Sequence, residues 1–223
     1  MKHEYTIAPG ITAFSTQRDE SLPFPVLQPH QTHTDHIAVI TSESTTRDDL
    51  MQTDALVTNL RGFAIGVRTA DCIPVLLYDP VCHAIAAIHS GWRGTVLKIA
   101  AKTIQAMTCE YGSNPADILA VIGPGIGPDS FQVGPEVAEE FRKAGFPMDI
   151  ILSDRGKRVE GTMQGGLHID LWKANRFILS QAGIKTGNIM VDGTCTYLNN
   201  DLFFSARHEG TKCGRIINAI MME

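Results

Sequence analysis

The sequence predicts an α+β fold, a single domain over residues 1–223 in which mixed β-sheets are flanked by helices. Two observations lead to this expectation. Short apolar runs rich in Val, Ile and Leu outnumber the segments with helical periodicity. The connections vary in length and are broken by Pro and Gly, unlike the regular alternation of a doubly wound fold. With 43% hydrophobic residues among 223, the chain can bury a full core without disulfides.

The first predicted elements are strands at 63–67, 73–78 and 84–88, three short runs rich in Ile, Val and Leu. After them, apolar residues recur at steps of three and four, which indicates an amphipathic helix that ends near Gly112. Ser90 is the candidate N-cap of this helix. Its apolar positions are Val96, Ile99, Ala100, Ile104 and Met107.

The second half of the chain begins with a predicted buried strand at 117–122 and the Gly- and Pro-rich loop 123–128. Glycines there permit close backbone approach, but two prolines, and no apolar helix directly after the loop, favour a plain turn over a nucleotide-phosphate loop. Pro135 opens a predicted helix that runs to about 144, and Asp170 caps another over 171–181. The remaining predicted strands are 188–191, 203–206 and 216–221.

Charge and composition narrow the classes of partner. The formal net charge is −5, and the 19 Lys and Arg residues are scattered along the chain, so we expect neither nucleic-acid nor anionic-membrane binding. No stretch has the apolar length of a signal peptide or a membrane span. A cytoplasmic protein with a small-molecule partner is the expectation, and the oligomeric state stays open.

The chain has five cysteines at wide spacings and no Cys-x-x-Cys pair, which argues against a disulfide framework. Cys82, Cys109 and Cys213 are expected to be small buried hydrophobes. Cys72 is different, because His33, Cys72 and His89 lie in three short segments that each offer one soft-metal ligand. Two imidazoles and a thiolate suit zinc, and three protein ligands leave a position for water or substrate. An enzyme with an open metal site is therefore the leading hypothesis.

Six segments, in order, resemble the YfiH-type laccase-domain family, and the resemblance runs from residue 31 to the end of the chain. The Ala-Asp-Cys and Gly-Trp-Arg-Gly blocks together are highly specific. The resemblance implies an α/β/β/α arrangement and metal ligation at His33, Cys72 and His89. The six segments are Gln31 to His33, Thr69 to Val75, Ile88 to Thr95, Ile122 to Pro124, Phe131 to Gly134 and Phe203 to Arg207.

The same resemblance implies two incompatible activities. One is a copper-dependent polyphenol oxidase. The other is a zinc-dependent purine nucleoside enzyme, which phosphorolyses adenosine, inosine or guanosine, cleaves methylthioadenosine and deaminates adenosine; a role in peptidoglycan-precursor editing is a further alternative. The purine activity is favoured because multicopper oxidation needs a separate oxygen-reducing cluster, hence many histidines, and this chain has eight.

Two other histidines bear on the metal. The run His30-x-x-His33-x-x-His36 is the strongest feature for copper, although His30 and His36 are more simply surface residues beside the ligand. A non-catalytic metal-binding subunit also stands as an alternative, with His30 or His36 completing a closed site.

Several arginines near the Cys and His motifs are candidate ligands for an anion. Phosphorolysis needs a bound phosphate, for which we expect Arg93 and the backbone N–H groups of Gly91 to Gly94 at the start of a helix. Arg68 or Arg207 would supply a second guanidinium. Arg93 could equally be a structural ion-pair partner.

Three further candidates complete the predicted site. Asp71 adjoins Cys72 and would either move a proton or act structurally, and both reach the site only if the strand has ended there. Gln132 is a candidate polar contact. His208 stands where the family has a second arginine, so phosphate affinity would weaken above roughly pH 7 if His208 binds the anion, given an imidazole pKa of ~6.5.

Overall fold

A six-stranded mixed sheet forms the centre of the protein, whose computed structural model describes residues 3–157 and 165–223. Its outer pairs, β12 with β8 and β3 with β4, are parallel, and its inner pairs are antiparallel. In spatial order the strands are β12 (Ile189–Val191), β8 (Leu119–Ile122), β6 (Ile73–Asp79), β7 (Ala84–Ser90), β4 (Ala55–Thr58) and β3 (Ile37–Ile40).

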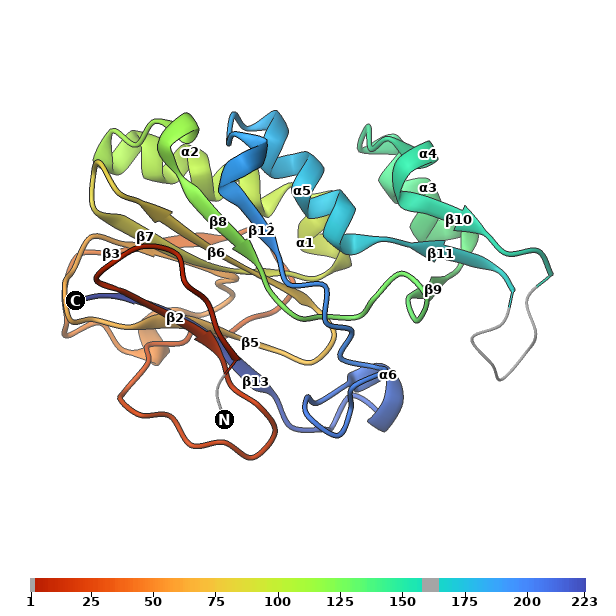
Figure 1. The fold of residues 1–223 in the computed structure, drawn as a ribbon, viewed down its shortest axis with the longest axis horizontal. Coiled ribbons are helices and arrows are strands. Elements are labelled where there is room, and N and C mark those ends of the chain that lie inside the picture. The colour runs from red at the N-terminus through yellow and green to blue at the C-terminus, as the bar shows by residue number, and fades with distance from the viewer. Residues whose placement is uncertain (1–2, 158–164) are drawn as a thin grey trace.

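Two smaller antiparallel sheets accompany it. A four-stranded sheet lies against one face of the central sheet, and a three-stranded sheet extends to one side (Figure 1). The four-stranded sheet has the order β1 (His3–Glu4), β2 (Ile11–Ser15), β13 (Ile216–Met222) and β5 (Ile65–Thr69). The three-stranded sheet has the order β10 (Leu152–Asp154), β11 (Leu167–Ile169) and β9 (Gln132–Val133).

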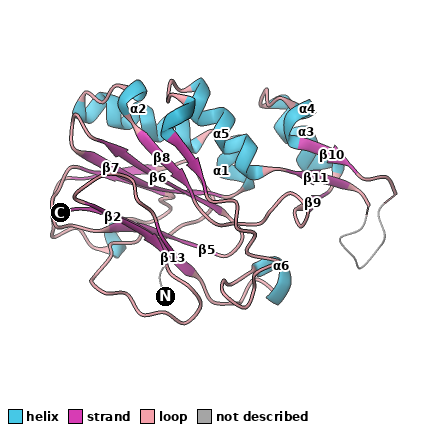
Figure 2. Cartoon of the chain, viewed as in Figure 1, coloured by secondary structure: helices cyan, strands magenta, loops and turns pink. Residues whose placement is uncertain are grey.

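Helices cover the other face of the central sheet, so that the layers run helix, sheet, sheet (Figure 2). In the described part of the chain, the far side of the four-stranded sheet carries short helical turns only. The covering helices are α1 (Trp92–Val96), α2 (Ile99–Tyr111) and α5 (Leu171–Gln181). The other helices are α3 (Pro135–Lys143), α4 (Met148–Ile151), α6 (Ala206–Glu209) and the 3₁₀ turns η1 (Arg47–Asp49), η2 (Pro115–Asp117) and η3 (Thr186–Asn188).

The layering explains the apolar runs of the central strands. All residues of β6 and β7 are buried, because both faces of the sheet are covered. Alternate side chains enter different cores: Val75 and Leu77 pack toward the helices, whereas Leu76 and Tyr78 pack between the two sheets. No helix of the described ranges is long and apolar enough to cross a membrane.

The predicted α+β class with mixed sheets is confirmed, and most predicted elements are present within two residues of their expected bounds. Asp170 caps α5 by accepting a hydrogen bond from the N–H of Lys173 at 2.9 Å. The predicted strand 203–206 is wrong, because Phe203 lies in a loop and Ser205 caps α6 instead.

The helix predicted after His89 is divided in two. Lys98 adopts a left-handed backbone (φ +59°), which separates α1 from α2. Ser90 is not the N-cap: it ends β7, and its hydroxyl lies 2.7 Å from Asn175 Oδ1 on α5. Gly91 occupies the N-cap position of α1.

Candidate metal centre

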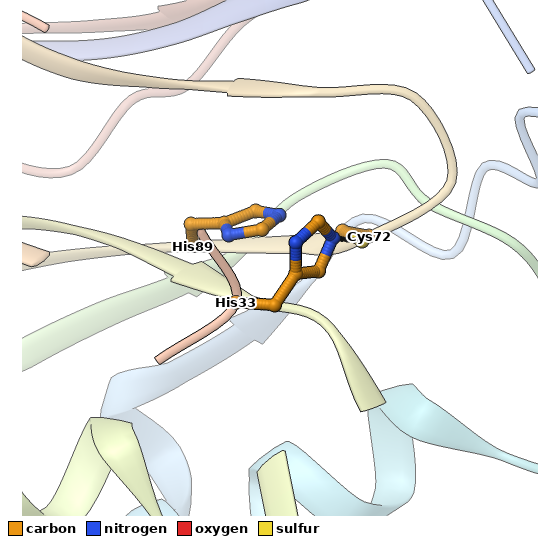
Figure 3. Close-up of side chains that lie close together, drawn as sticks. All are labelled: His33, Cys72 and His89. Atoms are coloured by element: carbon orange, nitrogen blue, oxygen red, sulfur yellow. Dashed lines mark hydrogen bonds between the residues drawn. The ribbon is translucent and has the colours of Figure 1, made fainter. Parts of the chain in front are cut away.

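Strand register brings the candidate ligands to one end of the two-sheet sandwich. Pro74 pairs with His89 across β6 and β7, so Cys72, two residues before Pro74, lies just beyond the end of β7. Because His89 alternates with Ile88, it faces the space between the sheets rather than the helices. The ligand atoms of His33, Cys72 and His89 all lie within 4.8 Å of one another (Figure 3).

A buried carboxylate orients His89. Asp54 immediately precedes β4, is fully buried, and has Oδ1 2.7 Å from Nδ1 of His89. The backbone N–H of His89 also donates to the carbonyl of Asp54 at 2.8 Å. This contact leaves Nε2 of His89 for the cluster, which is the arrangement that metal-binding histidines ordinarily have with a carboxylate.

The same carboxylate holds the loop that carries His33. Asp54 accepts hydrogen bonds from the backbone N–H groups of Thr32, His33 and Thr34, at 2.8 to 3.1 Å, and from the Thr34 hydroxyl at 2.7 Å. His33 has a left-handed backbone (φ +62°), which is unfavourable for a residue with a side chain. The hydrogen bonds to Asp54 compensate for this strain and fix the imidazole at the cluster.

Cys72 follows a tight turn between β5 and β6, and its Sγ lies 3.8 Å from Nε2 of His33. Gly91 lies close to both side chains. A Cβ atom at Gly91 would be 2.9 Å from Sγ of Cys72 and 3.2 Å from Cδ2 of His33. Only glycine therefore leaves room for the thiol and imidazole to converge.

Mutual electrostatics favour the charged forms of the donors. Burial raises the pKa of the Cys72 thiol, but the charge of His89 and the hydrogen bond with His33 outweigh burial and lower this pKa to about 6. Burial lowers the pKa of His89, whereas Cys72 and Asp54 raise it to about 9. Burial also disfavours the Asp54 carboxylate, yet its bonds to His89 and Thr34 hold its pKa well below the usual range. A bound cation would take the place of the proton on His89.

The donor set fits a soft or borderline divalent metal. A thiolate and two imidazoles at this separation can ligate zinc or copper, and the three donors leave a further coordination position open. They lie in a pocket of about 530 Å³, a size typical of small-molecule sites. His30 and His36 are not in the donor group, and Nε2 of His30 lies 3.6 Å from exposed Asp48.

Asp71 lies in the turn before Cys72 but its carboxylate is directed elsewhere. Its backbone is left-handed (φ +84°). Strand β5 has already ended at Thr69, so the condition under which Asp71 and Cys72 could both reach the site is met. Oδ1 accepts from the Thr196 hydroxyl at 2.7 Å, and Oδ2 accepts from the N–H of Arg207 at 2.6 Å. These contacts tie the turn to the start of α6, and Asp71 does not line the pocket.

The glycine- and tryptophan-containing junction forms the start of a helix of five residues. Gly91 contacts the ligands, and Gly94 is buried against α2, where a Cβ would lie 3.3 Å from Ile99. Arg93 is exposed, stacks on the ring of Trp92 at 4.4 Å, and does not line the pocket.

Of the other predicted anion ligands, the pocket includes Arg68 only. The guanidinium of Arg207 donates to the carbonyls of Ser130 and Gln132 at 3.4 and 3.1 Å. Gln132 Nε2 donates to the carbonyl of Gly165 at 2.9 Å. His208 is exposed, with Nδ1 3.2 Å from Nδ2 of Asn200. These side chains are thus held outside the pocket lining.

Sequence reasoning missed Asp54, Arg47 and Arg215. Asp54 was detectable in principle, since it directly precedes the apolar run Ala55–Thr58. Arg47 lies in a polar segment and Arg215 precedes β13; both line the pocket, although nothing in their sequence context marks them. Cys213, expected to be an inert hydrophobe, is half-buried and lines the same pocket.

Together, the fold and donor set define an α+β protein with a candidate open metal site. The family model described as multi-copper polyphenol oxidoreductase laccase matches residues 15–223, and the chain belongs to this family. A protein named purine nucleoside phosphorylase, from Bacteroides thetaiotaomicron, is 44% identical over 210 residues, 93% of this chain and 75% of the relative. A protein named adenosine deaminase RL5, from an unknown prokaryotic organism, is 40% identical over 201 residues, 87% of this chain and 74% of the relative.

Solved structures agree with this assignment. The hypothetical protein YfiH of Bacillus licheniformis has a TM-score of 0.85 at 28% identity and covers 99% of both chains. Neisseria meningitidis protein NMB0706 has a TM-score of 0.82 at 25% identity, covering 100% of this chain and 98% of its own. The predicted resemblance to YfiH-type proteins is therefore confirmed.

Proposed function

We propose that this protein is a zinc-dependent purine nucleoside phosphorylase, acting on adenosine, inosine, guanosine and methylthioadenosine, with adenosine deaminase activity. The observation that carries the proposal is the His33, Cys72 and His89 donor group with a free coordination position, inside a pocket large enough for a nucleoside. The names of the two relatives, a phosphorylase and a deaminase, support the same class of substrate.

The residues of this chain would divide the work as follows. His33, Cys72 and His89 hold the metal, and Asp54 keeps the ring of His89 in position. Zinc, when bound, supplies Lewis-acid chemistry and lowers the pKa of a coordinated water. Arg68 lies in the same pocket and provides positive charge for the anionic co-substrate. Asp71 acts as a positioning residue, since both oxygens of its carboxylate accept hydrogen bonds from the protein.

A copper-dependent polyphenol oxidase is the second candidate. The description of the family favours it, and thiolate and imidazole donors bind copper more tightly than zinc. Against it, His33, Cys72 and His89 form a single donor group within the described part of the chain. Multicopper oxidation of phenols requires an additional oxygen-reducing cluster.

The test compares nucleoside turnover with and without phosphate. Metal-analysed protein is incubated with adenosine or inosine, and the products are separated by chromatography. We expect free base and ribose 1-phosphate only when phosphate is present, and inosine from adenosine as the sign of deamination.

A His89→Ala variant should lose both reactions, because it removes one of the metal ligands. His83→Asn is the matched control. His83 is exposed, lies outside the donor group and has φ +52°, a conformation that asparagine tolerates. Zinc-loaded protein that turns over no nucleoside, while copper-loaded protein oxidises phenols, would reject the proposal in favour of the second candidate.

A further inference from the structure

The wall of the metal pocket carries an unusual balance of charge. Three arginines, Arg47, Arg68 and Arg215, line the pocket, and neither Asp nor Glu is among its lining residues. The whole chain has a net charge of −5, so this local excess of positive charge is not a consequence of composition. Arginines that line a concave pocket without a neighbouring carboxylate to offset their charge attract an anion.

Arg68 is half-buried, and its backbone is held in place by hydrogen bonds. Its backbone is held by the side chain of Gln31, whose Oε1 accepts from the N–H of Arg68 and whose Nε2 donates to its carbonyl, both at 2.8 Å. Burial lowers the pKa of Arg68, and the positive charges of Arg47 and Arg215 lower it further, which agrees with the position of both side chains in the same pocket. Among the described residues, no ion pair is formed by Arg68.

Arg47 and Arg215 approach from two other elements. Arg47 opens η1, whose start is held by hydrogen bonds from Thr46 N–H and Oγ1 to the Asp49 carboxylate, at 2.9 and 2.8 Å. Arg215 donates to the carbonyls of Thr211 and Gly214, at 2.9 and 2.8 Å, and is therefore a fixed charge with fewer free donors. In the described parts of the chain, Arg47 likewise makes no ion pair.

We propose that Arg47 and Arg68, with Arg215 beside them, form a subsite for a tetrahedral phosphate dianion, either free or as the phosphoryl group of an ester. Guanidinium groups from different directions match an anion with several oxygens better than they match a single carboxylate. The inference rests on the proposed function for the use of this phosphate in phosphorolysis. It assigns the phosphate to Arg47, Arg68 and Arg215, which line the pocket, rather than to Arg93 or Arg207, which do not.

The experiment measures binding directly, without nucleoside. Inorganic phosphate is titrated calorimetrically into the parent protein, Arg68→Gln, Arg47→Gln and Arg142→Gln at low ionic strength. Arg68→Gln should weaken phosphate binding about ten- to hundredfold, since charge-assisted hydrogen bonds are lost in a half-buried position. Arg47→Gln, which removes an exposed charge, should weaken it about two- to fivefold. Arg142 is exposed on α3 beside Glu139, and its variant should bind as the parent does.

Two further arms make the result specific. An Arg68→Lys variant keeps the charge without the planar fork, so it should give intermediate affinity, and it replaces Arg68→Gln if that variant does not fold. His33→Ala should retain arginine-dependent phosphate binding, which separates the subsite from phosphate bound to a metal. Ribose 5-phosphate and ribose distinguish the sources: competition by the ester but not by the sugar shows that an esterified phosphoryl group also enters.

Failure of the subsite and failure of the proposed function are distinguishable. Phosphate binding that is absent in the parent, or unchanged in Arg68→Gln, would overturn the subsite whatever the enzyme assay gives. Arginine-dependent phosphate binding in a protein that turns over no nucleoside would leave the subsite standing and reject phosphorolysis.

Discussion

At the level of single residues, the Asp54 side chain holds two of the three donor residues, His33 and His89, in position. One of its oxygens contacts the ring of His89, and both receive N–H groups from the loop that carries His33. Complete burial makes each of these contacts stronger than it would be in water, and it makes their loss more costly.

The first prediction concerns this carboxylate. Asp54→Asn keeps the size of the side chain but removes the charge that orients His89, so zinc affinity should fall about 10- to 100-fold. Competition with a chromophoric chelator gives the affinity. Asp48→Asn is the control, because the Asp48 carboxylate is 97% exposed and lies outside the donor group. Equal zinc affinity in the parent and Asp54→Asn would show that Asp54 does not orient the ligand.

The second prediction concerns the space beside the thiol. Gly91→Ala would place a methyl group 2.9 Å from Sγ of Cys72, which forces the thiol or the helix start to move. Because metal ligation tolerates errors of only ~0.2 Å, zinc affinity should fall about tenfold or more.

Gly187→Ala is the matched control for this change. No atom lies within 4 Å of a Cβ at Gly187, and its backbone does not require glycine. Chelator competition should therefore give the affinity of the parent. If Gly91→Ala also retains that affinity, the close approach of Gly91 to Cys72 has no part in metal binding.

At the level of elements, the turn between β5 and β6 depends on the loop at 123–128. The carbonyl of Asp71 accepts from the N–H of Ile126 at 2.8 Å, and Gly125 packs directly against the turn. The expectation that glycines here permit close backbone approach agrees with this packing. The loop at 123–128 therefore packs against the turn that carries Cys72 and holds it in position.

The third prediction follows from that packing. A Cβ at Gly125 would lie 2.5 Å from Cδ1 of Ile73 and 2.9 Å from the carbonyl oxygen of Asp71. Gly125→Ala should cost about 1–3 kcal/mol in the free energy of unfolding, a fall in Tm of roughly 2–12 °C for a chain of this length. Differential scanning calorimetry measures the change, again with Gly187→Ala as the control. A Tm equal to that of the parent would mean that the turn tolerates displacement.

The helices and strands also show where the sequence pattern was sufficient to predict secondary structure. Strands β6, β7 and β8 were predictable because burial on both faces gives continuous apolar runs. Strands β1, β9 and β10 have two or three residues each and carry too short a pattern to be detected. The segment 203–206 has the aromatic residues of a strand, but Ser205 caps a helix by accepting from the N–H of His208.

At the level of the whole molecule, the donor group joins three segments that are distant in sequence. His33 precedes β3, Cys72 precedes β6 and His89 belongs to β7, so the site exists only when the sandwich is assembled. A metal that binds this arrangement binds the folded state in preference to the unfolded chain.

The fourth prediction is that zinc stabilises the protein. At a free zinc concentration of about 100 times Kd the gain should be about 2.7 kcal/mol, which raises Tm by roughly 5–10 °C for a chain of this length. Thermal unfolding with and without zinc, after removal of metal by a chelator, gives the shift. Cys72→Ser should largely abolish it, whereas Cys109→Ser, at an exposed cysteine outside the donor group, should not. The same shift in both variants would locate zinc elsewhere.

The sequence by itself determined the chemistry of the donors and the buried strands β6, β7 and β8, whereas the fully buried β4 was not predicted. Residue type limits what a side chain can ligate, and periodicity limits which faces can be buried. Only the tertiary structure decided which polar side chains surround the donors. Arg207 and Arg47 are the same residue type, yet carbonyls of the loop before β9 and of β9 itself engage Arg207, while Arg47 lines the pocket. The reason is that hydrogen-bond partners are assigned by the packing of distant segments, which local sequence does not encode.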